Sequence, residues 1–187
     1  MATSRTTITD EELLRLPKDG NKYEVVDGEL RISPAGLRHE RIVARLIGLL
    51  GQFVDERRLG DVLGSNLLYV LPSGNKRAPD VSFVAAGRLE PFRNAAFPRL
   101  APDLAVEVIS PGDSPRQVLD RVGEYLQAGV RLVWVIEPEG RTATIYRTLT
   151  DVRTVEENGA LDAADVLPGF RCALSELLLA TKPDVAS

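Results

Sequence analysis

The chain has little of the residue types on which much enzyme chemistry depends. Its 187 residues include one cysteine, Cys172, and one histidine, His39. One cysteine excludes an internal disulfide, and a closed zinc site built only from Cys and His needs about four such ligands. A Ser-His-Asp triad would have to use His39, and no G-x-S-x-G elbow accompanies any serine. The phosphate-binding patterns G-x-x-x-x-G-K-[ST] and G-x-G-x-x-G are also missing. Carboxylate chemistry with Mg²⁺, Mn²⁺ or Ca²⁺ remains.

Long apolar runs are missing too, since no stretch approaches the roughly 18 residues of a membrane span. The first residues are polar and have no apolar h-region, so we expect a cytoplasmic protein that does not associate with membranes. Hydrophobic residues make up 44% of the chain, which fits one domain over residues 1–187 with a proper core. The net charge of −4 counts against a general nucleic-acid coat protein, but a nuclease can rely on a local basic groove and a bound metal.

The order of the predicted elements indicates an α/β fold with a mixed central sheet flanked by helices. Thr9 and Glu12 have the spacing of a capping box, and Asp27-Gly28 between two strand-like runs predicts an N-terminal hairpin. A strand–helix–strand order in the second half predicts a parallel strand pair. We expect strands at 22–26, 29–32, 62–63, 67–71, 80–84, 103–109, 131–137, 142–147 and 152–155, and helices at 10–16, 37–58, 115–128 and 175–180.

Two carboxylates fall in runs that read as buried strands. Asp80 precedes an apolar run and Glu107 lies inside another. An ionised carboxylate in such a place is unfavourable unless it is paired, hydrogen-bonded or bound to a cation. If the two strands are neighbours, Asp80 and Glu107 meet, and a divalent metal between them would relieve their repulsion. Asp103 lies earlier on the same strand face as Glu107 and is a further candidate.

Each of these acids also has a purely structural explanation. Asp80 and Asp103 both follow a proline, where an aspartate often caps a turn. Glu107 could instead form a salt bridge with a buried arginine, which would make the protein a structural one without metal.

Several segments, taken together, resemble a known family. They lie at 23–30, 33–34, 79–81, 102–111, 125–130 and 133–138, together with His39. In order and spacing they are similar to the Uma-type putative restriction endonucleases, members of the PD-(D/E)XK nuclease superfamily. The resemblance covers about residues 8–178 and implies a restriction-endonuclease-like core there, with the hairpin as an N-terminal extension. It also implies a Mg²⁺ or Mn²⁺ site in which Asp80 and Glu107 are the metal carboxylates.

The chain departs from this family at the lysine. The superfamily places a lysine two residues after the second acid, where this chain has Ile109. The resemblance implies a substitute on the following helix, and that position is Arg121. Arginine stays protonated and cannot act as a base, but it can bind phosphate or stabilise a transition state. Lys22 and Lys76 could replace the lysine in space, although nothing in the sequence indicates it.

Other candidates have weaker support. Gln117 shares a helix flank with Arg121, so both could face the site, although Arg121 could also be a surface residue. Glu24 is a candidate third metal carboxylate or a surface charge of the hairpin, and His39 a candidate phosphate contact or a polar residue at a helix start. A basic groove is a further hypothesis, formed by Arg38, Arg41, Arg45, Lys76 and Arg77.

The main functional hypothesis is a Mg²⁺- or Mn²⁺-dependent endonuclease in which Asp80, Glu107 and Arg121 act on the phosphodiester bonds of DNA. The alternative is a catalytically impaired nuclease fold that serves as a nucleic-acid-binding or assembly module, because Arg121 replaces the expected lysine. By analogy with restriction enzymes, which cut two strands, we also expect a homodimer or a higher homo-oligomer.

Overall fold

A six-stranded mixed sheet forms the centre of the computed structural model, which describes residues 8–17, 19, 21–33 and 36–178. The strand order is β10-β9-β8-β7-β6-β3. β7 and β8 are parallel, and the other neighbouring pairs are antiparallel. This confirms the mixed sheet and its parallel pair. The strands are β3 (Gly60–Gly64), β6 (Val81–Ala85), β7 (Leu104–Val108), β8 (Leu132–Glu137), β9 (Thr142–Tyr146) and β10 (Val152–Glu156).

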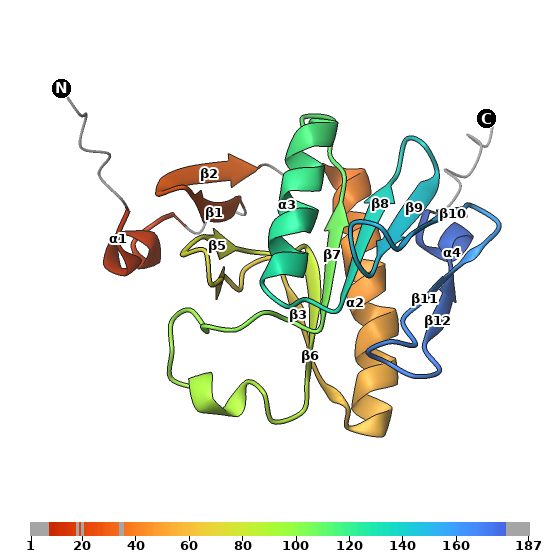
Figure 1. Cartoon of the computed structure of the whole chain (residues 1–187), viewed down its shortest axis with the longest axis horizontal. Coiled ribbons are helices and arrows are strands. Elements are labelled where there is room, and N and C mark those ends of the chain that lie inside the picture. The colour runs from red at the N-terminus through yellow and green to blue at the C-terminus, as the bar shows by residue number, and fades with distance from the viewer. Residues whose placement is uncertain (1–7, 18, 20, 34–35, 179–187) are drawn as a thin grey trace, which may run out of the picture.

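Two helices cover the opposite faces of this sheet. α2 (Leu37–Arg57) lies behind it and α3 (Pro115–Gln127) in front of it in the view of Figure 1. Because strand side chains alternate between faces, Val106 of β7 packs in the core cluster under α2, whereas Ala105 packs in the cluster under α3. Both faces of β7 are therefore covered, and each of its five residues is buried. Among the described helices, none is long and apolar enough to cross a membrane.

The N-terminal part adds a second, four-stranded sheet in the order β2-β1-β5-β4. Asp27 and Gly28, with φ of 53° and 80°, form the turn of the predicted hairpin. The capping box between Thr9 and Glu12 is present, so both local predictions are confirmed. The elements of this part are α1 (Asp10–Leu14), β1 (Lys22–Val26), β2 (Glu29–Ser33), β4 (Tyr69–Val70) and β5 (Lys76–Arg77).

Short elements account for most of the differences from the sequence prediction. The pattern did not predict β5, or the pair formed by β11 (Ala160–Asp162) and β12 (Arg171–Ala173), because two or three residues are too few to show an alternation. A single 3₁₀ turn, η1 (Glu90–Phe92), lies between β6 and β7. The last helix is α4 (Leu174–Leu178), and the final two residues of the predicted helix at 175–180 lie outside the described residues.

Candidate active site between the two sheets

Asp80 and Glu107 come together because β6 and β7 are neighbours. The antiparallel register pairs Val81 with Val106, so Asp80, one residue before β6, lies next to Glu107. Each residue is only 2% exposed. The backbone N–H of Val108 donates a hydrogen bond of 2.8 Å to Asp80 Oδ2. The sheet thus brings together the two acids that the sequence singled out.

A lysine from the N-terminal hairpin lies between these carboxylates. Lys22 Nζ is 2.9 Å from Asp80 Oδ1 and 3.3 Å from Glu107 Oε2. Lys22 is the first residue of β1, and its side chain is 11% exposed. The sequence named Lys22 only as one of two lysines that could replace the family lysine in space, and it did not indicate which. The usable signal was the alternation of β1, which places Lys22 and Glu24 on the same strand face, and both residues line the cleft.

Two further side chains hold the carboxylates in place. His39 Nε2, from the first turn of α2, is 3.1 Å from Asp80 Oδ2. Tyr125, from α3, donates a hydrogen bond of 2.7 Å to Glu107 Oε1. Tyr125 also belongs to the hydrophobic core under α3. It is fully buried, but its hydroxyl group also serves the site.

The charges in this cluster shift the pKa values of its members. Burial by itself would lower the pKa of Lys22, but the charges of Glu107 and Asp80 outweigh it and raise that pKa above its usual value. Burial would raise the pKa of Asp80, yet the ammonium of Lys22 and the hydrogen bond from His39 lower it. For Glu107 burial dominates, and the nearby charge of Asp80 adds to it, so the pKa of Glu107 is raised. Asp80 is therefore the more acidic member of the pair.

Arg121 lies beside the cluster but binds another partner more closely. Its Nη2 donates a hydrogen bond of 2.6 Å to Asp113 Oδ1, whereas its Nε is 3.9 Å from Glu107 Oε2. That Nε is buried and makes no hydrogen bond to any described residue. Only part of the Arg121 guanidinium is therefore hydrogen-bonded. The side chain lies at the edge of the site and is not a surface residue.

Gln117 lines the same cleft, but it completes the capping box of α3. Its side chain accepts hydrogen bonds from the backbone N–H and the hydroxyl of Ser114. The structure therefore gives Gln117 a local role in starting the helix that carries Arg121 and Tyr125.

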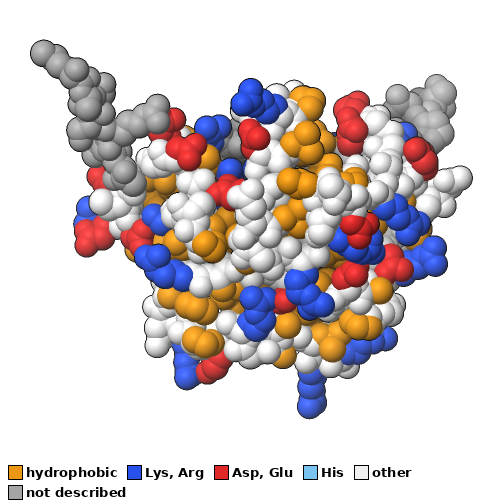
Figure 2. Space-filling view, viewed as in Figure 1, with side chains coloured by type: hydrophobic (Ala, Val, Ile, Leu, Met, Phe, Trp, Pro, Cys, Tyr) orange, Lys and Arg blue, Asp and Glu red, His pale blue; other side chains and the backbone are white. Residues whose placement is uncertain are grey.

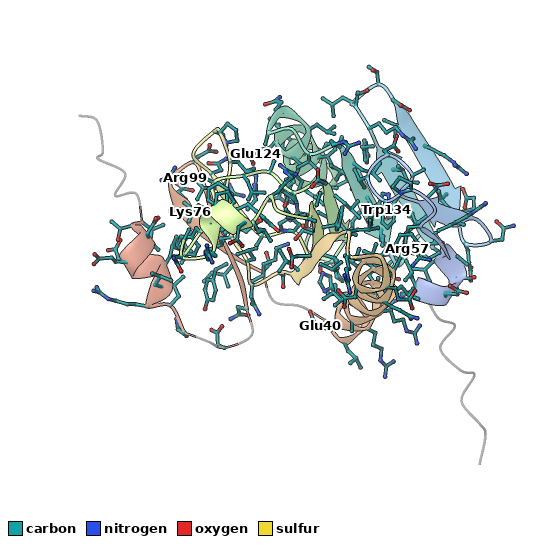
Figure 3. The ribbon with its side chains drawn as sticks, turned by 90° about the horizontal axis from the view of Figure 1, so that it is seen from below. Glu40, Arg57, Lys76, Arg99, Glu124 and Trp134 are labelled. Atoms are coloured by element: carbon teal, nitrogen blue, oxygen red, sulfur yellow. The ribbon has the colours of Figure 1, made fainter. Side chains whose placement is uncertain are left out.

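Glu24 is buried and is not a surface charge of the hairpin. It accepts hydrogen bonds from Arg77 Nη1, at 3.2 Å, and from the backbone N–H of Ala78, at 2.9 Å. Arg77 Nε also binds Glu124 Oε2 of α3, at 2.6 Å, and Glu124 is labelled in Figure 3. This chain of ion pairs connects the small sheet to α3 and closes one side of the cleft.

The structure places Asp103 away from the other acids. It precedes β7, at the end of the strand opposite to Glu107, and is not among the residues that line the cleft. Its Oδ2 accepts hydrogen bonds from Arg88 Nη1, at 2.5 Å, and from the backbone N–H of Ala85, at 2.8 Å. Asp103 shares a strand face with Glu107 but does not reach the site, because the two residues lie at opposite ends of β7.

The cleft around these residues has a volume of about 1010 Å³ and contains more acidic than basic side chains. Of the five residues expected to form a basic groove, only Arg77 lines it. On the face shown in Figure 2, basic and acidic side chains are interspersed and form no continuous basic stripe. The acidic lining residues are Glu24, Asp27, Asp80, Glu107, Asp113, Asp120 and Glu124, and the basic ones are Lys22, Arg31, Arg77 and Arg121.

The pair of carboxylates fits a hard divalent cation that keeps water ligands. Asp80 Oδ1 and Glu107 Oε2 both lie within 3.3 Å of the same ammonium nitrogen, so they already converge on one cationic point. Mg²⁺ is commonly held by one or two carboxylates, with water and substrate oxygens completing its shell. Within the described part of the chain, no group of three or more His, Cys, Asp and Glu side chains is arranged to hold a metal ion. A closed site formed by protein ligands alone therefore does not fit these residues.

Comparison with known proteins identifies a family and a fold for this chain. The sequence model of the Uma2 family, described as putative restriction endonuclease, matches residues 10–175. A solved structure, titled a putative nuclease belonging to DUF820 from Anabaena variabilis, superposes with a TM-score of 0.79 at 22% sequence identity. The match covers 91% of this chain and 97% of that one, and it establishes a shared fold. None of the curated proteins matches the chain.

Proposed function

Because the chain belongs to the Uma2 family of putative restriction endonucleases, we propose that it is a divalent-cation-dependent endonuclease that hydrolyses the phosphodiester bonds of DNA. The observation that carries the proposal is the convergence of Asp80 and Glu107 on one cationic point at the wall of the cleft. Both acids are almost fully buried, and a cation at that point would balance two charges that are unfavourable when unpaired.

Each residue of the cluster has a role in this proposal. Asp80 and Glu107 would hold Mg²⁺ or Mn²⁺, and the cation would supply Lewis acidity and an activated water. The Val108 N–H and His39 orient Asp80, and Tyr125 orients Glu107. Arg121, whose Nε is buried without a hydrogen-bond partner among the described residues, can donate to a phosphate oxygen.

Cleavage of supercoiled plasmid DNA tests this function. We expect nicking that depends on Mg²⁺ or Mn²⁺, and we expect it to disappear in Asp80→Asn and Glu107→Gln, which keep the side-chain shapes but remove a charge. Equal cleavage by the wild-type protein and these variants would show that another site or a contaminant is responsible.

Size-exclusion chromatography with light scattering, with and without DNA, would test the homodimer that we propose for cutting two strands.

A second function remains a candidate because of the charge of the cleft. Its acidic side chains outnumber the basic ones, and Arg121 occupies the position of the family lysine while bound to Asp113. The acidic excess weakens the attraction of DNA to the cleft, and an arginine cannot act as a base, so both features suit a nuclease fold with impaired catalysis that assembles, or binds nucleic acid, without turnover. DNA binding in the presence of Mn²⁺, with no cleavage at any enzyme concentration, would favour this alternative.

A further inference from the structure

Lys22 is the cationic group that contacts both carboxylates of the candidate site most closely. Its Nζ lies 2.9 Å from Asp80 and 3.3 Å from Glu107, whereas Arg121 Nε lies 3.9 Å from Glu107. Arg121 also directs its Nη2 to Asp113, and Ile109 carries no charge. Neither position at which the family pattern would place a lysine therefore supplies an ammonium group to the acids.

We propose that Lys22 is the active-site lysine of this protein and that its ammonium occupies the place of the divalent cation until that cation binds. The inference rests on the proposed nuclease function for its catalytic half only. Its other half concerns cation binding, and it can be tested without DNA.

The geometry implies that the Lys22 ammonium and a divalent cation compete for the same two carboxylate oxygens. Lys22 Nζ already uses one oxygen of each carboxylate, and both acids are 2% exposed. A divalent cation that binds the same two oxygens would lie within a few ångströms of the ammonium, where two positive charges repel strongly in a partly buried site. The cation can therefore bind only when the ammonium withdraws.

The hairpin allows the displaced ammonium to stay close to the reaction. Lys22 is the first residue of β1 and is anchored by its pairing with Ser33 in β2. Its four-carbon stem is flexible, so the head group can move while the backbone stays in place. An ammonium that leaves the two acids remains in the cleft, where it can donate a hydrogen bond to a phosphate oxygen and stabilise developing charge.

The variant Lys22→Met tests both the competition with the cation and the catalytic role of Lys22. Lys76→Met is the matched control. Lys76 is the other lysine among the described residues. It pairs with Asp10 of α1, does not line the cleft, and lies on the side of the molecule formed by the small sheet and α1 (Figure 3). Calorimetry without DNA should show Mn²⁺ binding to Lys22→Met about tenfold tighter than to the wild-type protein. At saturating Mn²⁺, plasmid cleavage by Lys22→Met should fall about 100-fold. Lys76→Met should match the wild-type protein in both measurements.

The outcomes separate this inference from the proposed function. Mn²⁺ affinity in Lys22→Met that is equal to or weaker than in the wild-type protein would overturn the competition, and unchanged cleavage at saturating Mn²⁺ would overturn the catalytic role. If the wild-type protein binds Mn²⁺ but cleaves no DNA, the nuclease proposal and the catalytic half fail, while the calorimetric comparison still decides the competition. If neither protein binds Mn²⁺, both proposals fail.

Lys22→Met leaves two carboxylates without their counter-ion, and it could unfold for that reason. Thermal denaturation then decides the question. We expect Mn²⁺ to restore the folded state of Lys22→Met, and we expect it to have no such effect on Lys22→Met combined with Glu107→Gln, which lacks one of the two acids. A Lys22→Met protein that stays unfolded in Mn²⁺ would contradict the inference.

Discussion

Tyr125 donates its hydroxyl hydrogen to Glu107 Oε1 over 2.7 Å, and this bond ties the core of helix α3 to the candidate site. Tyr125→Phe removes the donor and leaves a buried carboxylate oxygen without a partner. We expect the free energy of unfolding to fall by about 1–3 kcal/mol in urea denaturation. Cleavage should fall about tenfold, because Glu107 loses the group that orients it.

Tyr69→Phe is the matched control for this variant. Tyr69 is also fully buried, and its hydroxyl is 2.8 Å from Ser82 Oγ, a partner that does not line the cleft. We expect a loss of stability without a loss of cleavage per folded molecule. Equal cleavage by both variants would contradict an orienting role for Tyr125.

Two substitutions of Arg121 distinguish the role of its positive charge from the role of its side-chain shape. Arg121→Ala removes the buried guanidinium, and we expect initial rates of plasmid cleavage at saturating Mn²⁺ to fall about 100-fold. Arg121→Lys keeps the charge and restores the family pattern, so its rate should stay within about tenfold of the wild-type rate. An inactive wild-type protein that gains cleavage through Arg121→Lys would instead support the impaired-nuclease alternative.

His39 should give the protein a measurable dependence on pH. Burial alone would lower the pKa of His39, but the hydrogen bond and charge of Asp80 outweigh it, and the pKa is raised. The protonated ring therefore stabilises the metal-free folded state. This contribution is complete below the unfolded-state pKa of about 6.5 and is lost as the pH rises through the higher folded-state value. The destabilisation caused by His39→Gln should be larger at pH 6 than at pH 9.

Nuclear magnetic resonance can follow this group directly. The chain has one histidine, so every imidazole signal belongs to His39. We expect its titration midpoint in the metal-free protein to lie above 6.5 and to decrease in Asp80→Asn. A midpoint that is the same in both proteins would show that Asp80 does not stabilise the imidazolium.

Asp103 should matter for stability and not for cleavage. Asp103→Asn keeps an acceptor for the Ala85 N–H but loses the charge that binds Arg88. We expect urea denaturation to show a loss of about 1–2 kcal/mol. Plasmid cleavage per folded molecule should equal that of the wild-type protein, and a loss of Mn²⁺ binding would contradict the separation of Asp103 from the site.

Local patterns explain which parts of the fold could be predicted. The capping box at Thr9, the turn at Asp27-Gly28 and the apolar stripe of α2 involve residues a few positions apart, and all three are present. Their interactions form within one element, so a window of the sequence contains both partners. The strands β5, β11 and β12 were missed, because their two or three residues form strands only through partners elsewhere in the chain.

The acids of the site could be recognised for a similar reason. A charge inside an apolar strand or directly before one is conspicuous in the sequence itself, and this singled out Asp80 and Glu107. The same argument suggested Asp103, which is instead paired with Arg88 at the other end of β7. Burial is encoded locally, but the partner of a buried charge is not.

The amino-acid sequence alone indicated the α/β class, the hairpin and two carboxylates that need a cation. Only the tertiary structure decided which cation lies between them. Lys22 and Asp80 are 58 positions apart, and Lys22 and Glu107 are 85 apart. Lys22 lies in the small sheet and Glu107 in the central one, and Asp80 directly precedes β6 of the central sheet. Their meeting depends on how the N-terminal sheet packs against the end of the central one, and no periodicity along the chain records that packing.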